Sequence, residues 1–116
     1  MIRTTEDKKR IYQAMTVAGK PMDRHVGEVF NISDVVQFET DVNRKDRETG
    51  EEVVEKAVAT SIFADDGSMY TTVSPTVAKC LEALHDIFEG EIVGLTIKIT
   101  NGVSNNGNKF LQIDMM

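Results

Sequence analysis

Residues 59–75 read ATSIFADDGSMYTTVSP, and this stretch decides the fold. A β-rich run ends at Phe63, and the Asp-Asp-Gly triplet at 65–67 is a turn signal. Residues 69–73 are again rich in β-branched and aromatic side chains. The Ser-Pro pair at 74–75 is typical of a helix N-cap followed by proline at the first helical position. The stretch therefore predicts a hairpin that leads directly into a helix.

The same patterns extend to both sides of this hairpin. Period-two alternation predicts strands, and 3–4 spacing of apolar residues predicts helices. Ser33-Asp34 interrupts the first alternating run, which indicates a bent strand or two strands separated by a bulge, and the facing of Phe38 stays open. The predicted helices are 5–18 and 75–89, and the predicted strands are 26–42, 53–64, 69–73, 92–100 and 109–115.

This order predicts an all-β fold with one or two helices. A helix between the third and fourth of five strands is typical of the oligonucleotide/oligosaccharide-binding (OB) barrel, so we expect a five-stranded OB-like barrel with an extra N-terminal helix. We expect one domain over residues 1–116, with 1–24 as a helical extension and 25–116 as the barrel. Ligands of such barrels lie across strands two and three, between the loops predicted here at 43–52 and 101–108.

The candidate binding residues follow from strand alternation. If Met69 and Val73 face the core, Tyr70 faces outward. Exposed rings can stack on bases, and nearby lysine and arginine side chains can neutralise phosphates. The aromatic candidates on the barrel face are Tyr70, Phe63 and Phe110. The polar candidates are Lys98, Lys56, Arg44, Lys45, Arg47, Lys109, Asn105 and Asn106.

Two alternatives remain open at this point. Phe63 and Phe110 are equally explained by packing under the N-terminal helix or at a subunit interface. Arg44, Lys45, Arg47 and Lys56 lie among acidic residues, which is also typical of ordinary solvated surface.

Composition narrows the function classes. The net charge of −6 argues at first against nucleic-acid binding, but the acids are concentrated in residues 25–74 and on the helix that follows. No apolar run has membrane-spanning length, and the first residues show no secretory signal. Cys80 is the single cysteine and excludes an internal disulfide, and no catalytic, metal-ligand or phosphate-loop motif is present. We therefore expect neither an enzyme nor a cofactor.

The chain resembles the single-stranded DNA-binding proteins of small tailed bacteriophages, a group that includes phages with protein-primed replication of linear genomes. The resemblance rests on IFADDGSMY at 62–70, on the Val-Ser pair at 73–74 with Thr-Val-Ala at 76–78, and on the polar Gly-Asn loop before the last strand. A weaker match is Ile-Tyr-Gln-Ala at 11–14.

This resemblance implies sequence-independent coating of displaced single strands in the cytoplasm of the infected bacterial host. It implies stacking by Phe38 and Tyr70. Phage DNA polymerase or other replication proteins are partners to expect, and self-association is left open. The chain departs from related proteins in having no aromatic residue at 43–52, and it lacks the acidic C-terminal tail of the bacterial housekeeping proteins of like function.

The acidic middle segment favours a different function class. A protein-interaction module of the same fold, in which a phage factor binds a host or replication protein without DNA, is the alternative hypothesis.

Overall fold

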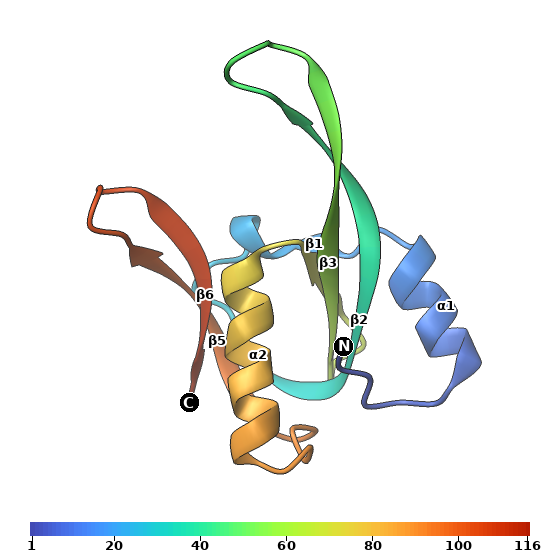
Figure 1. Cartoon of the computed structure of the whole chain (residues 1–116). Coiled ribbons are helices and arrows are strands. Elements are labelled where there is room, and N and C mark those ends of the chain that lie inside the picture. The colour runs from blue at the N-terminus through green and yellow to red at the C-terminus, as the bar shows by residue number, and fades with distance from the viewer.

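The computed structural model describes all 116 residues as two helices, one short 3-10 helix and one curled six-stranded sheet (Figure 1). The sheet order is β1-β4-β3-β2-β5-β6. The strands are β1 (Lys20–Pro21), β2 (Val29–Lys45), β3 (Glu52–Ala64), β4 (Met69–Thr72), β5 (Thr96–Val103) and β6 (Lys109–Met115). The helices are α1 (Lys8–Thr16), the 3-10 helix η1 (Met22–Arg24) and α2 (Pro75–Ile87).

The hairpin and helix start predicted from residues 59–75 are confirmed. Gly67 has a φ of 91°, a conformation that L side chains rarely adopt, and the Asp66 side chain accepts a hydrogen bond of 2.8 Å from the Ser68 N–H. Ser74 is the N-cap of α2, its hydroxyl oxygen accepting a hydrogen bond from the Val77 N–H.

β2 is the bent strand that the Ser33-Asp34 interruption indicated. Its first residues, Val29–Asn31, pair with β5, and the strand then pairs with β3 from Ile32 to Lys45. The register shifts between Ile32 and Asp34, so Ser33 is the extra residue of a bulge.

Both predicted loops are shorter than expected. β2 continues to Lys45 and β3 begins at Glu52, so residues 46–51 form the first loop. β5 continues to Val103, which leaves residues 104–108 for the second loop. The polar side chains at these positions predict loops, yet strand pairing uses backbone N–H and C=O groups. Polar residues supply these groups as well as apolar residues do.

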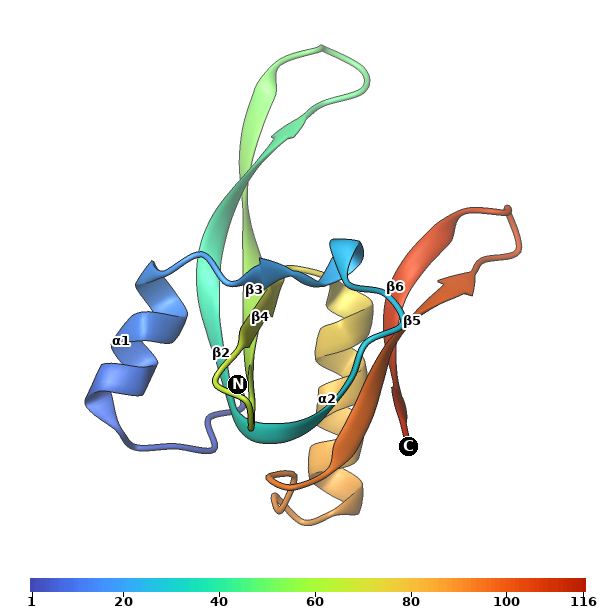
Figure 2. The same ribbon diagram turned by 180° about the vertical axis from the view of Figure 1, so that it is seen from behind.

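The curled sheet encloses α2 on its concave side (Figure 2). The main core joins α2 to the sheet through buried side chains that include Val77, Leu81, Ile62 and Ile97. The architecture confirms the predicted all-β, OB-like class. The strand count is six instead of five because β1 pairs in parallel with β4. No helix has the length and apolar character needed to cross a bilayer.

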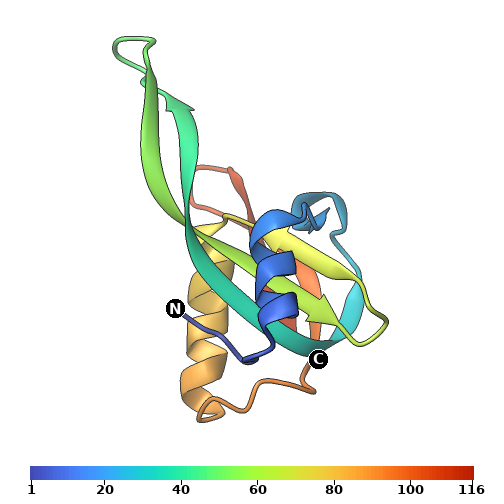
Figure 3. The ribbon, with the colours of Figure 1, turned by 90° about the vertical axis from the view of Figure 1, so that its right-hand side faces the viewer.

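Part of the outer face of the same sheet is covered by α1 (Figure 3), so α1 and α2 lie on opposite sides of the β2–β3 ribbon. Among the apolar residues at this helix, Ile11 packs partly buried against the sheet. Ala14 is the buried residue, at 2% exposed, while Met15 and Ala18 are exposed. Because Ala14 is small the helix approaches closely, and the Ser61 hydroxyl donates to the Ala14 carbonyl at 3.1 Å.

Replacing Phe63 by alanine tests this second core. Phe63 is 5% exposed beneath α1, so Phe63→Ala should lower the free energy of unfolding by about 3–5 kcal/mol. Urea unfolding measures the change. Phe110→Ala is the matched control, because Phe110 is only half-buried, and its loss should be clearly smaller. Equal losses in the two variants would contradict this placement of α1.

Candidate nucleic-acid interface

The β2–β3 and β5–β6 hairpins project from the same side of the molecule (Figure 1). Between the two hairpins and the start of α2 lies a groove with a volume of about 510 Å³, which we call the hairpin groove. β2 contributes Arg44, β6 contributes Phe110 and Leu111, η1 contributes Asp23, and the connection from β4 into α2 contributes residues 71–76. The groove therefore combines one aromatic ring, one guanidinium group, one carboxylate and a row of hydroxyl groups.

Phe110 is placed in this groove by its cross-strand neighbour. It pairs with Gly102 of β5, and a Cβ atom at position 102 would lie only 2.2 Å from the Phe110 ring. The ring therefore lies over the glycine, in space that any other residue would occupy. Phe110 remains half-buried, so part of it is free to contact a ligand.

Arg44 is the cation of the hairpin groove. Its Nε lies 3.3 Å from the Glu55 carboxylate, and both side chains are more than half exposed. Exposed ion pairs of this kind contribute little stability, so a phosphate can replace Glu55 at small cost.

The hydroxyl groups of Thr72, Ser74 and Thr76 lie at the N-terminus of α2, where the helix dipole also favours an anion. These three residues are not among the candidates predicted from the sequence. The predicted helix start at 74–75, next to a candidate ligand face, was the signal that could have identified them.

The other predicted cations and amides lie on the hairpins that flank the groove. Lys98 faces outward as predicted, since its strand neighbours Ile97 and Ile99 are buried. Lys56 lies on β3 and lines a neighbouring groove. The remaining exposed candidates lie toward the hairpin tips: Lys45, Arg47, Asn105, Asn106 and Lys109.

The outward orientation predicted for Tyr70 is wrong. Tyr70 is 3% exposed, and its ring stacks on Phe30 with centroids 4.5 Å apart and an interplanar angle of 10°. Its hydroxyl donates a 3.0 Å hydrogen bond to Glu28. Alternation along β4 is intact, because Met69 lies on the α1 side and Tyr70 on the α2 side. The prediction failed because both faces of the strand are covered.

Phe38 and Phe63 also lie in the interior. They are 9% and 5% exposed and belong to the core beneath α1, with the Arg10 guanidinium 5.1 Å from the Phe63 ring centroid. For Phe63, packing under the N-terminal helix is therefore the correct alternative. Of the four aromatic candidates, Phe110 is the one that lines a groove.

Comparison with known proteins adds an independent observation. The sequence matches the family described as phage single-stranded DNA-binding protein over residues 2–116. The chain belongs to this family. The resemblance inferred from residues 62–70 is thereby confirmed.

Two relatives of this phage family are the single-stranded DNA-binding proteins of Bacillus phage phi29 and Bacillus phage PZA. Each is 28% identical over 114 residues, which cover 97% of this chain and 87% of the relative. No solved structure matches the chain.

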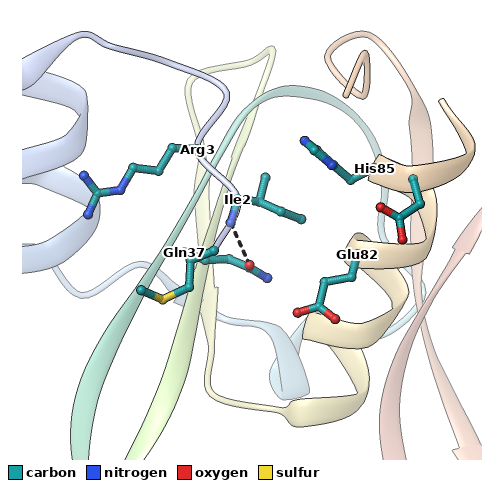
Figure 4. A pocket seen from close by; sticks show the side chains of 7 residues that line it. Ile2, Arg3, Gln37, Glu82 and His85 are labelled. Atoms are coloured by element: carbon teal, nitrogen blue, oxygen red, sulfur yellow. Dashed lines mark hydrogen bonds between the residues drawn. The ribbon is translucent and has the colours of Figure 1, made fainter. Parts of the chain in front are cut away.

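Apart from the hairpin groove, the structure has a hollow between its N-terminal residues and α2 (Figure 4). The Gln37 side-chain oxygen accepts a 3.0 Å hydrogen bond from the Ile2 N–H. The Arg3 side chain points away from α2. Glu82 and Asp86 supply carboxylates to this hollow, which makes it unfavourable for phosphate. No cluster of three or more His, Cys, Asp or Glu side chains suited to a metal ion is present.

The buried Tyr70 has a perturbed acidity. Burial raises the pKa of Tyr70 to about 12, and the hydrogen bond to Glu28 acts in the same direction. That hydrogen bond is also the largest cause that lowers the pKa of Glu28, with His25 contributing and burial opposing. The hydrogen bond therefore favours the ionised form of Glu28 and the neutral form of Tyr70.

Alkaline titration tests the position of Tyr70. In a Tyr12→Phe variant, Tyr70 is the remaining tyrosine, and its tyrosinate absorbance should rise near pH 12 instead of the ordinary value of 10.0. The unfolded chain loses this proton near pH 10 while the folded chain keeps it, so stability should fall as pH rises from 10 to about 12. Titration near pH 10 in the folded protein would contradict the buried, hydrogen-bonded phenol.

Proposed function

We propose that this chain binds single-stranded DNA without base-sequence preference and coats and protects displaced strands during phage DNA replication. The observation that carries the proposal is the hairpin groove, in which Phe110 and Arg44 lie together beside the N-terminus of α2. Membership of the phage family and the names of both relatives support it.

The groove supplies the two interactions that sequence-independent binding needs. Every base has a π face, so stacking on Phe110 tolerates any base and contributes about 1–3 kcal/mol. Arg44 and the hydroxyl groups at the start of α2 bind phosphate oxygens, which are the same in every nucleotide. Lys98, Lys109, Asn105 and Asn106 on one hairpin, and Lys45 and Arg47 on the other, serve as flanking contacts.

The proposal assigns stacking to Phe110 and not to the interior rings. Tyr70 and Phe38 would have to leave the core to reach a base, which would expose apolar surface to water. Their role is to hold the sheet on which the groove is built.

The proposal extends to the setting in which the protein acts. The 116 residues act as one OB-like domain, without a cofactor and without catalysis, in the cytoplasm of the infected bacterium. Phage DNA polymerase and other replication proteins are candidate partners, and self-association would allow continuous coating of a strand.

Truncation of Phe110 tests the proposed stacking. Phe110→Ala should weaken binding of labelled oligo-dT at low salt by about 1–3 kcal/mol, roughly 5- to 150-fold in Kd. Tyr70→Phe is the control and should bind like the wild type. Fluorescence anisotropy measures both, with duplex DNA as competitor. Unchanged affinity in Phe110→Ala would remove Phe110 from the site.

Absence of oligo-dT binding by the wild type at low salt would reject the function itself. If a pull-down with the same protein then retained a replication or host protein in stoichiometric amount, the protein-interaction alternative would be favoured.

Substitution of Gly102 tests whether the position of the Phe110 ring matters for binding, without removing the ring. Gly102→Ala places a methyl group where the Phe110 ring lies, so the ring must move away. We expect affinity for oligo-dT to fall in the same direction as in Phe110→Ala, while thermal unfolding changes little because both residues lie near the end of the hairpin. Wild-type affinity would show that the position of the ring is unimportant.

A further inference from the structure

A second groove adjoins the hairpin groove and lies between the β2–β3 hairpin and α2. It has a volume of about 340 Å³, and we call it the helix groove. The two grooves share Arg44, Val73 and Pro75 as common walls. A flexible ligand can therefore pass from one groove into the other across Val73 and Pro75.

Cationic side chains from three separate elements line the helix groove. They are Arg44 of β2, Lys56 of β3 and Lys79 of α2. Neither Lys56 nor Lys79 forms an ion pair with an acidic side chain within 4.0 Å. In a chain of net charge −6, the three cations that line this groove outnumber its one carboxylate, Glu82.

The floor between these cations is apolar. Ala57, Val58, Val73 and Ala78 line it, and Val73 is 42% exposed although it is aliphatic. An apolar floor with a cationic rim suits a nucleotide, whose base is flat and apolar on its faces and whose phosphate is anionic.

The positive charge ends at Glu82. Glu82 lines the far end of the helix groove and also the hollow that contains His85 and Asp86 (Figure 4). A phosphate beyond Lys79 would meet the carboxylates of Glu82 and Asp86 and be repelled. The charge pattern thus marks an end to any anionic path on this side of the molecule.

We infer that the single strand continues from the hairpin groove across Val73 and Pro75 into the helix groove, where Lys56 and Lys79 bind the next phosphate groups and Glu82 ends the path. This inference rests on the proposed function and extends it, because it adds α2 to the DNA-binding surface. It makes Lys79 a DNA contact and Glu82 a residue that limits the length of strand bound.

Two oligonucleotide lengths test the inference. We expect oligo-dT of about 4 nucleotides to occupy the hairpin groove and one of about 8 nucleotides to reach the helix groove as well, both within the range of OB-type sites. Lys79→Gln should weaken binding of the longer oligonucleotide several-fold and reduce its log–log salt slope by about 0.7, the value for one phosphate contact on a single strand. The shorter oligonucleotide should bind Lys79→Gln and the wild type equally.

Glu82→Gln gives the opposite sign and guards against a folding artefact. It removes the repulsion at the end of the path, so it should strengthen binding of the longer oligonucleotide. Lys9→Gln is the matched control, because Lys9 is an exposed helical lysine of α1 that lines neither groove. It should leave affinity and salt slope unchanged.

The outcomes separate this inference from the proposed function. If the wild type binds both oligonucleotides and Phe110→Ala weakens both, while Lys79→Gln and Glu82→Gln bind the longer one like the wild type, the inference is overturned and the function stands. An equal loss for both lengths in Lys79→Gln also overturns it, because Lys79 would then act in the hairpin groove. Failure of the wild type to bind either oligonucleotide removes the function and the inference together.

Discussion

The bend of β2 at Ser33 is the constraint on which the rest of the structure depends. Before the bulge the strand is hydrogen-bonded to β5, and after it to β3, so one strand joins both hairpins. The bend is also where the N-terminal segment is attached. Asp34 accepts a 2.8 Å hydrogen bond from the Thr4 hydroxyl and forms an ion pair with Arg10 of α1. The two hairpins and the N-terminal segment with α1 therefore meet at this single irregularity.

The position of α1 explains why the proposed binding surface differs from the expected one. An OB-like barrel offers the outer face of its second and third strands to a ligand. Here α1 covers part of that face and buries Phe63 and Phe38. The open surface lies toward the hairpins, where Arg44, Phe110 and the N-terminus of α2 meet. In the proposed site, the local arrangement of these groups matters more for a phosphate backbone than the net charge of −6.

Sequence patterns predicted most of the fold and part of the site. Local sequence patterns correctly predicted the turn at 65–67, the N-cap at Ser74 and the bulge near Ser33. Each of these features depends on a few neighbouring residues with specific backbone preferences. Alternation along β5 likewise predicts the outward orientation of Lys98, because its neighbours Ile97 and Ile99 are buried. Tyr70 was misassigned because alternation states which residues share a face and not whether that face is covered. Tyr70 is covered on the α2 side by Phe30 and the main core, whereas α1 covers the opposite face, which carries Met69.

The sequence by itself determined the order of strands and helices, the OB-like class and the family, since all of these depend on local patterns and on matched motifs. The tertiary structure alone decided which aromatic ring reaches solvent and which cations lie together. Burial depends on what packs against a strand from a distance, as Ala14 of α1 does against Ser61. The hairpin predicted at residues 59–75 forms as predicted, yet its Tyr70 is a core residue. Among the aromatic candidates, the ring that remains open to a ligand is Phe110, which lies over Gly102 on the neighbouring strand.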